Sequence, residues 1–233
     1  MMAQRSFGRS ALTFLAGVAS MVLVGCGLFM SSSSYRYRMT VEGTHSGSSV
    51  YEILAEKKNG PLLPDEKPGG SIIKGEALVI ETPSGPVFAL LTPAQGGGDL
   101  IGAITRALTP DIVWNGQPNF WKAVNRLASA GEGEVKAELP REEWPMMVRF
   151  RDLNDPKSVE RVDPAAAGVT RVLLETTKDD VTVGIEKRLG WLCSKFSFFE
   201  DERDPVTGFL MPPSVVTVAH SLNRRHFSTE TDK

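Results

Sequence analysis

Residues 72–81 and 86–91 are two apolar runs joined by Thr-Pro-Ser-Gly at positions 82–85. Proline presets φ for a tight turn, and glycine adopts the positive φ that such turns need. The two runs are therefore predicted to form an antiparallel hairpin. Together with the alternating segments that precede it, the hairpin predicts an antiparallel meander in the first third of the folded domain.

Alternation of apolar and polar residues predicts several further strands. In residues 35–42, Tyr37, Met39 and Val41 share one side, and the residues between them are polar. The same criterion gives strands over residues 49–55, 144–151, 158–162, 169–176, 215–219 and 226–228.

Three segments have helical periodicity. Residues 100–108 follow Asp99, a natural N-cap, and residues 120–130 precede Gly131, a natural C-cap. One of two adjacent aspartates opens a third predicted helix over residues 179–192.

The predicted fold is α+β, an antiparallel sheet of about seven or eight strands with about three packed helices. The chain is apolar enough to build a core of its own. A single globular domain over residues 35–233 is favoured, and a division near residues 131–140 is the alternative.

The first 25 residues have the layout of a secretory signal. Arg5 and Arg9 precede an apolar run over residues 11–24, and the first ten residues contain no acid. This run is shorter than the roughly 20 residues that a helix needs to cross a bilayer. A cleaved signal is therefore favoured over the alternative, a signal-anchor helix.

Leu23, Val24, Gly25 and Cys26 resemble the lipobox of bacterial lipoproteins, in which apolar and small residues precede an obligatory cysteine. The resemblance implies cleavage between Gly25 and Cys26. Cys26 would then carry a diacylglyceryl group on its thiol and an acyl chain such as palmitate on its amine. Two or three such chains hold a protein on a bilayer essentially permanently. The alternative is a buried cysteine behind an ordinary cleaved signal.

The same resemblance implies partners and a location. The partners are the lipid bilayer and the lipoprotein-processing and sorting machinery. Gly27 stands where an Asp would favour retention at the inner membrane, so the outer membrane is expected, with the domain facing the periplasm. Residues 26–34, with serine at 31–34, are expected to form a flexible tether.

The charge balance argues against nucleic acid as a partner. The chain has 26 basic and 28 acidic side chains, and loss of Arg5 and Arg9 with the signal lowers the net charge from −2 to −4. Phosphate neutralisation needs clustered Lys and Arg. Once Cys26 is acylated, Cys193 stands alone, so no internal disulfide is expected. Aromatic neighbours predict that Cys193 is a small buried side chain rather than a nucleophile.

No familiar catalytic or metal-binding motif occurs in the sequence. His45, His220 and His226 lie in no Cys/His metal spacing, and there is no Gly-x-Ser-x-Gly elbow. The glycines at 96–98 lack the Lys-Ser or Lys-Thr of a phosphate loop and precede Asp99. They predict a flexible connector rather than an anion site. No metal or cofactor is predicted.

Arginines on or beside the predicted strands form the candidate binding site. They are Arg149, Arg151, Arg161 and Arg171, with acids at Asp152, Glu160, Asp163 and Glu175. Opposite charges that face each other across a sheet contribute about 0.2–1 kcal/mol per pair, which would make these residues structural. The functional alternative is a groove for an acidic or peptidic partner.

Residues 144–192 are also similar to uncharacterised envelope proteins of proteobacteria, a similarity that names no activity. The sequence therefore favours an envelope lipoprotein with a non-catalytic binding or scaffolding role. The alternative is a hydrolase or transferase whose Ser, His and Asp residues meet only in the fold. A pocket with a His in hydrogen-bond reach of a Ser or Asp would favour the enzyme.

Overall fold

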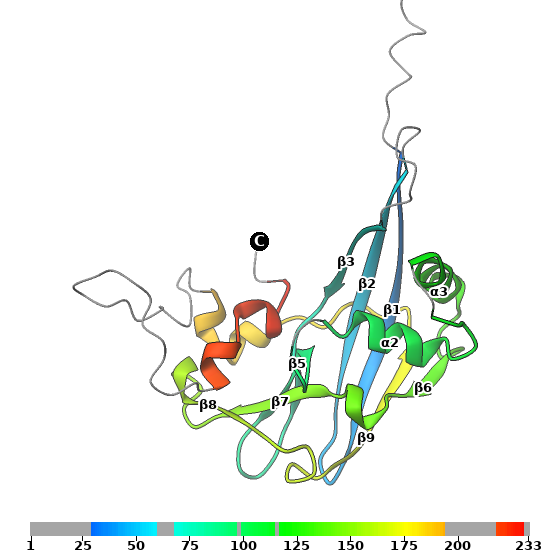
Figure 1. The fold of residues 1–233 in the computed structure, drawn as a ribbon. Coiled ribbons are helices and arrows are strands. Elements are labelled where there is room, and N and C mark those ends of the chain that lie inside the picture. Colours follow the sequence, from blue (N-terminus) through cyan, green and yellow to red (C-terminus); the bar gives the residue numbers. More distant parts are fainter. Residues whose placement is uncertain (1–28, 60–67, 97–98, 115–116, 194–217, 231–233) are drawn as a thin grey trace, which may run out of the picture.

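The computed structural model describes residues 29–59, 68–96, 99–114, 117–193 and 218–230. These residues form two antiparallel sheets and two α-helices, which confirms the α+β class (Figure 1). The first sheet has the order β3 (Pro68–Lys74), β2 (Gly47–Asn59), β1 (Phe29–Gly43), β9 (Val169–Thr176) and β6 (Lys136–Glu138). The second has the order β4 (Leu78–Ile80), β5 (Val87–Pro93), β7 (Pro145–Phe150) and β8 (Val159–Arg161).

The prediction that residues 72–91 continue the meander of the preceding strands in one sheet was wrong. The predicted strand over residues 72–81 is interrupted at Gly75. That glycine has φ +139°, and a Cβ there would lie 2.6 Å from the ring of Tyr51. The chain therefore leaves β3 and starts β4 in the other sheet. The predicted turn is confirmed, since the Gly85 N–H donates to the Thr82 carbonyl at 3.0 Å.

The long hairpin of β1 and β2 starts earlier in the sequence than predicted. The serines at 31–34 pair with residues 54–57 of β2, so they belong to a strand and the flexible tether was wrong for them. A serine side chain does not prevent the backbone from completing a ladder. Residues 1–28, which include the predicted signal, Gly25 and Cys26, lie outside the described residues.

The larger core is formed by the inner face of the first sheet, one face of the second sheet and two helices, α2 (Ile101–Leu108) and α3 (Gln117–Ser129). On β1, Tyr37, Met39 and Val41 are buried as the alternation predicted. On α2, the apolar stripe is buried as predicted. The Asp99 carboxylate accepts a hydrogen bond from the Ile101 N–H at 3.0 Å, so Asp99 stabilises the helix start.

A second core packs the second sheet against short 3-10 turns from the end of the chain. Its aromatic centre is Phe88, Phe150, Trp191 and Phe227, with ring centroids of the contacting pairs 5.5–5.8 Å apart. The turns are η3 (Ile185–Lys187), η4 (Gly190–Cys193), η5 (Val218–Ser221) and η6 (Arg224–His226).

The predicted helix over residues 179–192 was wrong. Residues 177–184, which we call the strap, form neither helix nor strand, and only the short turns η3 and η4 follow. Thr182 makes two hydrogen bonds with Val50 of β2. Its N–H donates to the Val50 carbonyl at 3.0 Å, and its hydroxyl oxygen accepts from the Val50 N–H at 2.9 Å. Tertiary hydrogen bonds and β-branched residues here outweigh the helical spacing of apolar residues.

The predicted strands near the end of the chain are also replaced. Residues 215–217 lie outside the described residues, and Val218 and Ala219 belong to η5. His226 ends η6, and Ser228 makes an isolated antiparallel bridge with Glu76. No helix among the described residues has the length and apolar character needed to span a bilayer.

Candidate functional site

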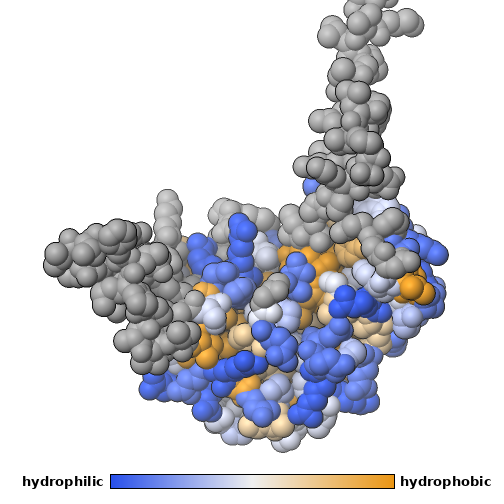
Figure 2. Space-filling view, in the orientation of Figure 1, coloured by the Kyte–Doolittle hydropathy of each residue, from blue (hydrophilic) through white to orange (hydrophobic). Residues whose placement is uncertain are grey.

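A hollow of about 490 Å³ opens where three turns meet at one end of the molecule. The turns are those between β1 and β2, between β4 and β5, and between β8 and β9, at the lower end of Figure 1. Its polar lining consists of Arg149, Arg161, His45, Asp163 and the hydroxyls of Thr44, Thr82 and Ser84. In Figure 2 the lower end of the molecule is coloured mainly as hydrophilic to intermediate surface. We call this hollow the arginine hollow.

Two glycines fix how closely the walls of the arginine hollow approach each other. The Thr44 N–H donates to the Gly168 carbonyl at 2.9 Å, and a Cβ on Gly43 would lie 1.8 Å from that oxygen. Gly168 itself has φ +73°, and a Cβ there would lie 2.8 Å from the Thr44 hydroxyl oxygen. Larger residues would push the two turns apart.

Arg149 and Arg161 enter the arginine hollow from neighbouring strands. Arg149 on β7 stands opposite Glu160 on β8, and its guanidinium lies 3.4 Å from that carboxylate. Arg161 donates from Nη2 to the Ala94 carbonyl at 2.5 Å. Within the described residues, no carboxylate lies within ion-pair distance of Arg161. Arg161 therefore has no ion-pair partner in that part of the chain, although Asp163 lines the same hollow, and its guanidinium retains donors for a ligand.

The other two candidate arginines lie elsewhere. Arg151, whose side chain is 73% exposed, pairs with Glu160 at 3.1 Å. Arg171 is on β9 of the first sheet and pairs with Glu42 at 2.6 Å. Neither residue lines the arginine hollow. The structure thus brings together Arg149 and Arg161 but not all four arginines.

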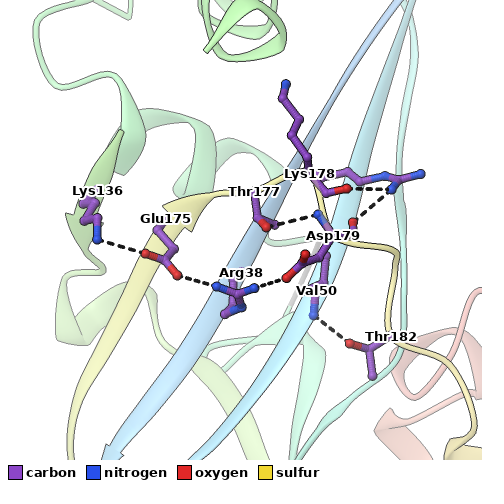
Figure 3. A network of polar contacts seen from close by, with 9 residues as sticks. Arg38, Val50, Lys136, Glu175, Thr177, Lys178, Asp179 and Thr182 are labelled. Carbon is purple, nitrogen blue, oxygen red and sulfur yellow. Dashed lines mark hydrogen bonds and ion pairs between the residues drawn. The ribbon is translucent and has the colours of Figure 1, made fainter. Parts of the chain in front are cut away.

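The prediction that arginines face acids across strands is confirmed for Arg149 and Glu160. Glu175, which was expected to serve the same arginines, belongs instead to a network on the outer face of the first sheet (Figure 3). There it pairs with Arg38 at 2.6 Å and Lys136 at 3.1 Å. Hydrogen bonds from these two cations lower the pKa of Glu175.

The same network holds the strap against the sheet. Arg38 also binds the Asp179 carboxylate (Figure 3). Arg36 donates to the Asp179 carbonyl at 2.9 Å and to Asp180 Oδ1 at 3.0 Å. A second hollow of about 410 Å³ lies beside this network, lined by Thr40, Glu42, Lys136, Glu175 and three apolar residues. The charges are paired with one another, so the network is a structural clamp rather than a binding site.

The arginine hollow contains the residue types of a hydrolase but not their arrangement. His45, Ser84 and Asp163 all line it. Ser84 Oγ lies 3.1 Å from the Thr82 hydroxyl, and Asp163 Oδ1 accepts from the Ala165 N–H at 2.8 Å. In the described structure, no hydrogen bond joins His45 to Ser84 or Asp163. A nucleophile and its base need such contact.

The remaining titratable candidates lie apart from the arginine hollow. His226 Nδ1 accepts from the Asn223 N–H at 3.2 Å, and burial lowers the pKa of His226. Cys193 was expected to be buried, but it is exposed, because Leu189 and Leu192 take the buried positions of this segment. Among the described residues, no three His, Cys, Asp or Glu side chains are grouped to hold a metal ion.

No family model, curated protein or solved structure matches this chain. The hydroxyls and His45 of the arginine hollow were missed by sequence reasoning. Thr82 and Ser84 were recognised only as parts of a turn, and His45 as a histidine that lies in no metal-binding spacing. Their spacing carries no signal, since the three turns come from separate parts of the chain and meet only in the fold.

Proposed function

We propose that this protein is a lipid-anchored envelope protein that binds an acidic group of a partner in the arginine hollow. The observation that carries the binding role is that Arg161 lines the hollow beside Arg149 and, among the described residues, has no carboxylate within ion-pair distance. The lipid anchor at Cys26 rests on the lipobox-like residues 23–26 and on the basic and apolar segments before them. Gly27 after the cysteine favours the outer membrane as its final location.

The chemistry of the arginine hollow suits a carboxylate-bearing peptide or polymer. Guanidinium groups bind carboxylates through paired, charge-assisted hydrogen bonds. The Thr44 hydroxyl adds a donor beside them, whereas the Thr82 hydroxyl already donates to the Gly85 carbonyl at 2.6 Å and accepts from Ser84 at 3.1 Å. Asp163 places one negative charge on the wall, which disfavours a densely charged polyanion and favours a ligand with few acids.

The binding test uses the detergent-solubilised lipoprotein and a fluorescent, C-terminally amidated peptide that carries a single glutamate among glycines. We expect Arg161→Ala to weaken binding about tenfold, equivalent to about 1.4 kcal/mol, which is near the lower end for a hydrogen bond to a charged group. Arg171→Ala is the matched control, because Arg171 lies outside the hollow and is paired with Glu42. Equal losses in the two variants, or no binding by the wild type, would contradict the proposed role.

The anchor is tested separately by the intact mass of membrane-extracted protein. We expect a mature chain that begins at Cys26 and carries the added mass of lipid chains, and we expect Cys26→Ser to lose that mass. An uncut chain, or a free Cys26 thiol, would refute the anchor and leave the binding test unaffected.

An envelope hydrolase or transferase is the second candidate, because His45, Ser84 and Asp163 share one hollow. It is tested with aryl ester substrates on the wild type, Ser84→Ala and His45→Ala. Activity that both substitutions abolish would favour the enzyme over the binding protein. The missing hydrogen bonds between these residues predict no such activity.

A further inference from the structure

The open end of the β1–β2 hairpin, opposite its turn, forms a narrow projection together with β3. We call this three-stranded projection the finger. It comprises residues 29–36 of β1, residues 52–59 of β2 and β3. At its tip the register pairs Phe29 with Asn59, and Lys57 with Pro68. Figure 1 shows the finger extending away from the body of the domain, beyond α3.

The tip of the finger is tied closely to Cys26 by the covalent chain. Phe29, the first residue of β1, follows Cys26 by three residues. An extended chain spans at most about 3.6 Å per residue, so the two Cα atoms are no more than about 11 Å apart. Lipid on Cys26 would therefore hold the tip of the finger at the headgroups of the bilayer.

The arginine hollow lies at the other end of β1. Thr44 and His45, which line it, directly follow the last residue of that strand, Gly43. The 14 residue steps from Phe29 to Gly43 correspond to about 45 Å at the usual rise of about 3.3 Å per residue. Cross-strand pairing along the whole length of β1 keeps this separation fixed.

We propose that the tip of the finger is the membrane-contacting surface and that the finger is a stalk. It presents the arginine hollow about 45 Å from the lipid-bearing end of β1. The acidic partner is then a macromolecule of the aqueous layer next to the membrane, and the headgroups of the anchoring bilayer are out of reach. This inference rests on the proposed anchor at Cys26.

The test measures the height of two sites on the protein above a bilayer by Förster resonance energy transfer from a dye on the protein to a dye on the lipid headgroups. Lipidated Cys193→Ser protein in phosphatidylethanolamine–phosphatidylglycerol vesicles receives a donor dye at Ser32→Cys in the finger or Ser46→Cys in the far turn. Both serines are exposed. The acceptor is a headgroup dye whose Förster distance lies between the two expected heights. We expect strong transfer from position 32 and weak transfer from position 46.

Two further variants sharpen the result. Ser48→Cys, also exposed, repeats the far measurement if the first turn variant fails to fold. A ten-residue Gly-Ser insertion after Cys26 is expected to reduce transfer from position 32, because it lengthens the short link to the bilayer. Equal transfer from both ends in vesicle-bound, lipidated protein would overturn the stalk and leave the anchor intact. Absence of lipid mass on Cys26 would overturn the anchor itself.

Discussion

Tyr37 and Tyr35 make a matched pair for testing the first core. Tyr37 is fully buried on β1, and its ring stacks on Tyr51 with centroids 5.2 Å apart. Its hydroxyl has no hydrogen-bond partner in the described structure. Tyr35, two residues earlier, shares a hydrogen bond of 2.9 Å with the Thr105 hydroxyl. Burial raises the pKa of both tyrosines, so each hydroxyl is neutral across the physiological range.

The two Tyr→Phe substitutions should have opposite effects on stability. A buried polar group without a partner costs about 1–3 kcal/mol, so Tyr37→Phe should raise the free energy of unfolding by about 1 kcal/mol. Tyr35→Phe removes a hydrogen bond and should lower it by about 1 kcal/mol. The loss is moderate because Thr105 still donates to the Ile101 carbonyl at 2.6 Å.

Urea unfolding followed by tryptophan fluorescence measures both free energies. Equal slopes of the unfolding free energy against urea concentration in the two variants show that their unfolded states match. A thermal scan should separate the two variants by about 4–8 °C, since about 2 kcal/mol divides them in a domain of this size. If Tyr37→Phe destabilises the protein as much as Tyr35→Phe, the Tyr37 hydroxyl has a partner in solution. The reasoning about an orphaned group would then be wrong.

Three further predictions concern other parts of the fold. Phe227→Ala, in the aromatic centre of the second core, should lower the free energy of unfolding, measured by urea denaturation, by about 3–5 kcal/mol. Val183 is 64% exposed, so Val183→Ala should change this free energy by less than about 0.5 kcal/mol. Burial raises the pKa of Glu76, so the stability that its protonated carboxyl contributes is lost as pH rises through that raised value. Relative to the wild type, the free energy of unfolding of Glu76→Gln should therefore increase from acidic to neutral pH, and a difference that does not change with pH would refute this. Gly43→Ala should weaken binding of the single-glutamate peptide, because its Cβ would collide with the Gly168 carbonyl, and unaltered binding would show that the two turns can move apart without cost.

Local sequence patterns located most of the strands because alternation reflects one buried face. The predicted strand over 169–176 coincides with β9, and α2 begins within one residue of its prediction. The helix over 179–192 failed because helical spacing says nothing of competing tertiary hydrogen bonds, here those of Arg36 and Val50 to the strap. The division into two sheets depends on Gly75, whose contact with Tyr51 is visible only in three dimensions.

The sequence predicted some residues of the candidate site but not the others. Arg149 and Arg161 could be named because both fall on predicted strands, where opposite charges pair across the sheet. Which of the arginines meet was not predictable, since Arg171 lies in a different sheet from Arg149 and Arg161. His45 and Ser84 could not be assigned, because no spacing rule connects one turn to another across a fold.

The position of β1 in the first sheet sets the order in which that sheet can be completed. A chain that emerges N-terminus first, from a ribosome or through an export channel, exposes β1 early and lets it pair with β2 at once. Its other neighbour, β9, lies more than a hundred residues later, as the pairing of Glu42 with Arg171 illustrates. One edge of β1 therefore stays open until nearly three quarters of the chain has emerged. Pairing of β1 with β9 across so long an intervening segment is slow. Until it occurs, the open edge of β1 must be protected from pairing with strands of other chains.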